Sequence, residues 1–107
     1  MAWIMLGAAG LLEVVWALAL KSSDGLSPRS AATYLFLGAA AASFALLAAA
    51  LRHLPVGTAY AVWTGIGAVG AAIAGVVLYG DAATASRLAA IGMIAVGIVW
   101  LASVSHA

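Results

Sequence analysis

The chain has 107 residues, of which 67% are hydrophobic and only 7% are charged, and its formal net charge is +1. Soluble domains carry about 25% charged residues, so this composition cannot cover a water-facing surface and indicates an integral membrane protein. The low net charge excludes a basic surface for nucleic acid. The absence of cysteine excludes disulfide frameworks and thiolate metal sites.

Charged and turn-forming residues divide the chain into four apolar segments. The first break contains Lys21 and Arg29, the second contains Arg52, and the third extends from Gly80 to Arg87. Each segment has about 17–23 residues, the length of one transmembrane helix, and none shows the alternation of a transmembrane β-strand. We therefore predict an all-α membrane protein, a single domain over residues 1–107, with transmembrane helices near 2–20, 31–51, 57–79 and 88–104.

The loops are short, so consecutive helices should be antiparallel neighbours, with both termini on one side of the membrane. Lys21, Arg29 and Arg87 then lie on the opposite side, and Arg52 lies on the side of the termini. The positive-inside rule places the more basic loops in the cytoplasm. Because the difference is only two side chains (three against one), the sequence is compatible with insertion in both orientations.

Glu13 is the only charged residue of the first apolar segment. A charge near the centre of a membrane helix costs about 2.5–3.5 kcal/mol on insertion scales, so an acid there is a candidate functional residue. Gly10 and Trp16 share its face of the helix. Gly10 leaves room beside the carboxylate, and Trp16 offers an indole N–H donor. The alternative is a neutral acid that hydrogen-bonds a neighbouring helix.

Other segments supply aromatic and polar groups at membrane depth. Tyr60 and Trp63 are three residues apart and face one way in the third segment, although aromatic side chains also serve packing or interfacial anchoring. Ser43, amid the alanines of the second segment, can orient a carboxylate or bond a carbonyl of its own helix. Gly65 and Gly67 lower helix stability and predict a bend or hinge in the third helix.

A carboxylate with aromatic walls and a hydroxyl describes a site for a small organic cation. The carboxylate can hold a proton or, once ionised, a cation, and this mutually exclusive occupancy is the physical basis of antiport. Four short helices with one acid cannot easily enclose a pathway, so we expect a homodimer with two coupled Glu13 residues. Two copies in opposite orientations would imitate the inverted repeats of larger transporters.

Residues 13–21 and 55–70 resemble two sequence signatures of the small multidrug resistance family of proton-coupled transporters. The resemblance extends over essentially the whole chain. The second of these stretches is similar to the third-helix signature of the family. The first is similar to the first-helix signature of one subtype, the guanidinium exporters, whereas drug-exporting relatives usually carry a small residue at the position of Trp16. Gly10, Ser43 and residues 57–60 also favour the guanidinium subtype.

The resemblance implies a function and a role for each candidate residue. It implies proton-coupled export of guanidinium and small substituted guanidinium ions by an antiparallel, dual-topology homodimer in the bacterial inner membrane. Glu13 would be the shared proton and substrate site, and Trp16 and Ser43 would hydrogen-bond and orient it. Tyr60 and Trp63 would line the pocket, with Tyr60 also acting in gating. The two glycines of the third helix would mark its bend, and the fourth helix would serve dimerisation.

Alternatives remain open at the level of the sequence. A broad exporter of quaternary ammonium compounds would use the same fold and the same Glu13, with Trp16 as the discriminating residue. A heterodimer with a paralogue is compatible with the charge bias. An assembly subunit without transport of its own would keep Glu13 protonated. The sequence contains no hydrolase triad or phosphate loop, and His53 and His106 are far apart, so we expect neither enzymatic activity, nor a cofactor, nor a bound metal.

Overall fold

The computed structural model describes residues 1–105, which form four α-helices: α1 (Ala2–Ser22), α2 (Ala31–Leu51), α3 (Val56–Tyr79) and α4 (Ala85–Val104). Each helix is long and apolar enough to cross a membrane. The prediction of an all-α chain with four helices capable of spanning a membrane is therefore confirmed. The principal extents of the molecule are 43 × 35 × 16 Å, so it is a slab rather than a compact bundle.

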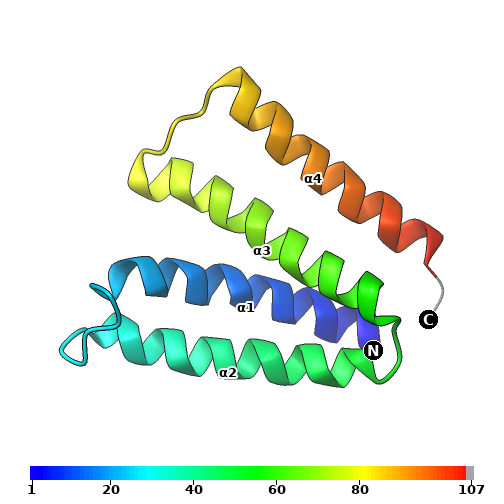
Figure 1. Ribbon diagram of the computed structural model, residues 1–107, viewed down its shortest axis with the longest axis horizontal. Helices are drawn as coiled ribbons and strands as arrows, with labels where there is room; N and C mark the ends of the chain where they lie inside the picture. Colours follow the sequence, from blue (N-terminus) through cyan, green and yellow to red (C-terminus); the bar gives the residue numbers. More distant parts are fainter. Residues whose placement is uncertain (106–107) are drawn as a thin grey trace.

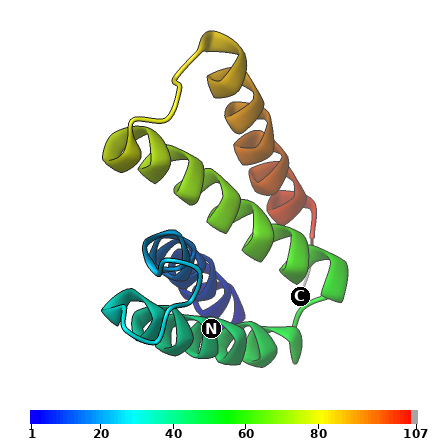
Figure 2. The ribbon, with the colours of Figure 1, turned by 60° about the vertical axis from the view of Figure 1, so that its left-hand side comes forward.

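The helices are arranged as a series of neighbours (Figure 1). α1 packs on α2 and α3, α2 also touches α3, and α4 packs on α3 alone among the described helices. Figure 2 shows α4 on the far side of α3 from the α1–α2 hairpin. No residue of α4 is buried within the described part of the chain. This helix therefore presents its apolar side chains to the surroundings rather than to a shared core.

Side-chain caps explain where two of the helices begin. The hydroxyl of Ser30 accepts a hydrogen bond from the N–H of Ala32 at 3.3 Å, and that of Thr84 accepts one from the N–H of Arg87 at 3.2 Å. Such caps satisfy N–H groups that have no partner within the first turn of a helix. Because Thr84 caps α4, this helix begins at Ala85 rather than at residue 88, and its first turn contains Arg87.

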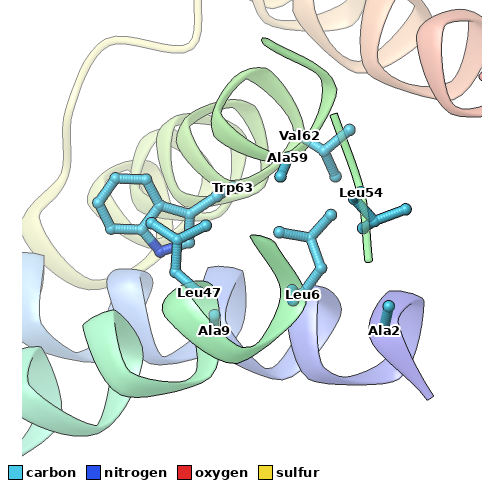
Figure 3. Close-up of a cluster of buried hydrophobic side chains, with 9 residues drawn as sticks. Ala2, Leu6, Ala9, Leu47, Leu54, Ala59, Val62 and Trp63 are labelled. Atoms are coloured by element: carbon cyan, nitrogen blue, oxygen red, sulfur yellow. The ribbon is translucent and has the colours of Figure 1, made fainter. Parts of the chain in front are cut away.

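The buried core lies where the first halves of α1 and α3 meet the second half of α2 (Figure 3). Many of its side chains are small, which permits the close approach by which dispersion contacts hold membrane helices together. The core fixes three helices next to the candidate functional residues. It consists of Ala2, Leu6, Ala9, Leu47, Ala50, Leu54, Ala59, Val62 and Trp63.

The opposite ends of α1 and α3 are also joined. The hydroxyls of Ser22 and Tyr79 are hydrogen-bonded at 2.9 Å, and Lys21 Nζ lies 5.3 Å from the centroid of the Tyr79 ring. An ammonium group at this distance is attracted by the face of an aromatic ring. α1 and α3 are therefore held together at both ends, with Glu13 between them.

α3 is a continuous α-helix through the two glycines at which a bend was expected. Both glycines admit a side chain from a neighbouring helix. A Cβ atom at Gly65 would overlap Ile98 of α4, and a Cβ atom at Gly67 would overlap Glu13 of α1. The absence of side chains at these positions therefore serves helix packing, a role that the expectation of a bend did not include.

Candidate functional site

The carboxylate of Glu13 packs directly on the backbone of α3. An added Cβ atom at Gly67 would overlap its Oε1, Cδ and Cγ atoms. The Glu13 side chain is partly buried, and its Oε1 atom is fully buried without a hydrogen-bond partner among the described residues. A buried polar atom without a partner costs free energy. Within the described residues this oxygen is therefore an acceptor whose hydrogen-bonding capacity is unused.

Trp16 lies one turn beyond Glu13 on α1 and is partly buried. Its indole Nε1 is buried and has no acceptor among the described residues. The ring packs edge-on against Phe36, with centroids 5.8 Å apart, and stacks on Phe44, with centroids 6.5 Å apart. The orientation of the indole is thus set by aromatic packing on α2, and its N–H remains available as a donor.

Ser43 is buried on α2 and joins three helices. Its hydroxyl donates to the carbonyl of Ala9 on α1 at 2.6 Å and accepts from Trp63 Nε1 on α3 at 3.0 Å. The sequence left open whether this hydroxyl bonds a carbonyl of its own helix or a carboxylate. In this structure it bonds a carbonyl of a different helix, one turn before Glu13. The single hydroxyl hydrogen is therefore engaged away from the carboxylate.

Phe44 is a further residue of the site that sequence reasoning missed. Its ring lies 6.5 Å from that of Trp16 and 5.1 Å from that of Trp63, and Trp63 in turn lies 5.5 Å from Tyr60. These rings form a continuous aromatic wall from α1 across α2 to α3. The spacing of Phe36 and Phe44, eight residues or about two helical turns apart, is a sequence signal that could have revealed it.

The structure separates the predicted site residues into two groups. Trp63 is 4% exposed and belongs to the core, whereas Tyr60 is 56% exposed. Glu13, by contrast, contacts Gly67. The space that Gly10 leaves is occupied by Ile66 of α3, because a Cβ atom at Gly10 would overlap that side chain. The hydroxyl and aromatic groups thus contact one another, whereas Glu13 packs on Gly67 of α3.

The described residues contain no group of three or more histidine, cysteine, aspartate or glutamate side chains that could hold a metal ion. His53 lies in the turn between α2 and α3, and His106 lies outside the described residues. The only acid within the described helices is Glu13. The chemistry of this site is therefore that of one carboxylate, with a hydroxyl and aromatic rings nearby.

Four helices long and apolar enough to cross a membrane, one of them with a carboxylate near its middle, define a small multi-pass membrane protein with a candidate functional acid. The family described as Small Multidrug Resistance protein matches residues 1–94 of the chain. The chain belongs to the small multidrug resistance family, as the resemblance of residues 13–21 and 55–70 predicted. It is a multi-pass protein of the bacterial inner membrane.

Several proteins named as guanidinium exporters are similar to this chain over nearly their whole length. That of Escherichia coli (strain K12) is 55% identical over 106 residues, which cover 99% of this chain and 100% of the relative. That of Yersinia pseudotuberculosis serotype I (strain IP32953) is 56% identical over 101 residues, covering 94% and 96%. That of Citrobacter freundii is 52% identical over 106 residues, covering 99% and 100%.

The bridge through Ser43 makes a testable contribution to stability. Replacing Ser43 by alanine should leave Trp63 Nε1 buried without an acceptor and lower the free energy of unfolding by about 1–2 kcal/mol. The measurement is equilibrium unfolding of the detergent-solubilised protein. Ser103→Ala is the matched control, because the Ser103 hydroxyl is exposed and donates only to the Trp100 carbonyl of its own helix. Equal stability losses in the two variants would contradict a structural role for the bridge.

Proposed function

We propose that the protein exports guanidinium and small substituted guanidinium ions in exchange for protons. The observation that carries this proposal is the buried Oε1 atom of Glu13, which has no partner among the described residues. Guanidinium is planar and presents N–H donors in the geometry of the arginine head group, which binds carboxylates bidentately. The names of relatives more than half identical to this chain support guanidinium as the ion.

Competition for one carboxylate provides the coupling. A protonated Glu13 is neutral and does not attract a cation, and a guanidinium-bound Glu13 cannot take up a proton. Each ligand therefore weakens the binding of the other by the same factor. Exchange of a proton moving down its gradient for guanidinium moving out of the cell follows if Glu13 becomes accessible from each side in turn.

We propose that the other site residues donate hydrogen bonds to this carboxylate or line the pocket around it. The Trp16 N–H has no acceptor among the described residues. Because guanidinium has no acceptor atom, this N–H cannot bond the ion, and its role in the proposal is to donate to the Glu13 carboxylate. Ser43 can donate to Glu13 only after its hydrogen leaves the Ala9 carbonyl. Tyr60 and Trp63 line the pocket, and the exposed Tyr60 is the gating residue.

A second copy of the chain completes the site in the proposal. One chain is a slab with Glu13 as the single acid of its described helices, and the rings of Tyr60 and Phe44 are more than half exposed. An antiparallel homodimer would cover these rings and bring two carboxylates to one pocket, where a planar cation can lie between them. Opposite orientations would also give the inward-facing and outward-facing states the same structure with the protomers exchanged.

The first test of this function is electrical. Proteoliposomes that contain the protein should give a transport current when guanidinium is added under a proton gradient. Glu13→Gln should abolish the current, because an amide can neither release a proton nor bind a cation by charge. Asp24→Asn is the control, since it makes the same acid-to-amide change in the first loop, outside the helices. Currents that persist in Glu13→Gln would exclude Glu13 as the shared site.

Binding measured across pH tests the competition directly. Titration calorimetry of the purified protein should show guanidinium binding that weakens as the pH falls, because protons then occupy Glu13. Where the proton-bound form dominates, each further pH unit should lower the apparent affinity about tenfold for one competing proton. An affinity that does not change with pH would leave no basis for proton coupling, and complete absence of binding would favour an assembly subunit.

Dual topology can be measured with reporters fused to the C-terminus. A cytoplasmic reporter and a periplasmic reporter should both be active, because the two sides of the membrane differ by only two basic side chains, three against one. Arg87→Ala removes one basic side chain from the side opposite the termini. It should therefore increase the fraction of chains with their termini in the cytoplasm. If only one of the two reporters were active in the native sequence, an antiparallel homodimer would be ruled out in favour of a dimer with a different partner.

A further inference from the structure

Glycines and side chains alternate across the contact between α1 and α3. A Cβ atom at Gly10 would overlap Ile66, one at Gly67 would overlap Glu13, and one at Gly70 would overlap Val14. At two of these three contacts, a hydrocarbon side chain of one helix fills the space that a glycine leaves on the other. At the third, the side chain is that of the intramembrane acid.

The contact at Gly67 places the Glu13 carboxyl group by shape alone. The backbone of α3 around Gly67 is α-helical, so its N–H groups are engaged within the helix. The carboxyl oxygen Oε1 lies against this backbone without a hydrogen-bond partner among the described residues. No other polar group therefore fixes this oxygen, and its position depends on the space that Gly67 provides.

We propose that Gly67 is a positioning residue for Glu13: the missing side chain lets the carboxyl group rest on α3, and this placement sets how it binds its proton and guanidinium. As far as guanidinium is concerned, the inference rests on the proposed function. It assigns to Gly67 a role distinct from a bend of α3. Even a methyl group at this position displaces the carboxyl group from α3.

The test compares two glycines of the same interface. Gly67→Ala places a methyl group against the carboxyl group, and Gly70→Ala places the same methyl group against the apolar Val14 about one turn further on. The first readout is the infrared carboxyl band that is lost in Glu13→Gln, followed as a function of pH. Its midpoint should move in Gly67→Ala and stay at the native value in Gly70→Ala. Equal midpoints in all three proteins, or equal shifts in the two variants, would overturn the proposal.

The second readout is the affinity for guanidinium, measured also in a double variant in which Glu13→Asp shortens the acidic side chain. Gly67→Ala should weaken guanidinium binding about tenfold, because the displaced carboxylate no longer meets the ion in its native geometry. Glu13→Asp should weaken binding in the native background but strengthen it in the Gly67→Ala background, because the shorter side chain leaves room for the new methyl group. This opposite sign is a coupling that two independent losses would not produce. Additive losses would overturn the proposal.

The proposal on Gly67 can still be decided if the protein binds no guanidinium or if Gly67→Ala does not fold. If the native protein binds no guanidinium, the proposed function fails, but the infrared titration still decides the role of Gly67. If Gly67→Ala does not fold, Glu13→Asp in the native background tests the same contact from the other side. Its midpoint should then differ from the native one by more than the roughly 0.4 units that separate free aspartate and glutamate. A difference no larger than that would overturn the proposal.

Discussion

The carboxyl group of Glu13 occupies a place where the contact between two membrane helices otherwise holds hydrocarbon. The neighbouring contacts of α1 with α3 pair a glycine with Ile66 or Val14, both apolar. An acid at such a place is accommodated sterically by Gly67 but not satisfied electrostatically, because its Oε1 atom has no hydrogen-bond partner within residues 1–105. Elsewhere this would be only a cost in stability. In the proposed function, this unpaired acceptor is the place where a proton or guanidinium binds.

The features that could be predicted from the sequence are those that depend on the order of residues along the chain. The thickness of a bilayer sets the length of an apolar segment, so the four helices follow from the spacing of charged and turn residues. Glu13 stands out because it is the only charge in its segment. Membership of the family could likewise be predicted from residues 13–21 and 55–70, which carry its most specific residues.

The contacts that could not be predicted depend on the rotation of each helix about its own axis. A helix of a soluble protein reveals its buried side by an apolar stripe, but these helices are apolar on every side. The sequence therefore did not indicate that Ser43 would bond the carbonyl of Ala9, 34 residues away, or that Gly67 would face Glu13. The Phe36–Phe44 spacing and the N-cap residue Thr84 are signals that the sequence does carry, but which rings Phe44 contacts again depends on helix rotation.

The isolation of α4 has a consequence for how the protein can change over evolutionary time. Because α4 packs on α3 alone among the four helices and has no buried residue in the part of the chain that the structure describes, the core makes few steric demands on its sequence. Apolar side chains of many shapes suit a lipid surface equally well, so any stricter selection on α4 must come from outside this chain. Mutations in α4 can therefore change the outer surface of the protein while the contacts of Glu13 within its own chain are inherited unchanged.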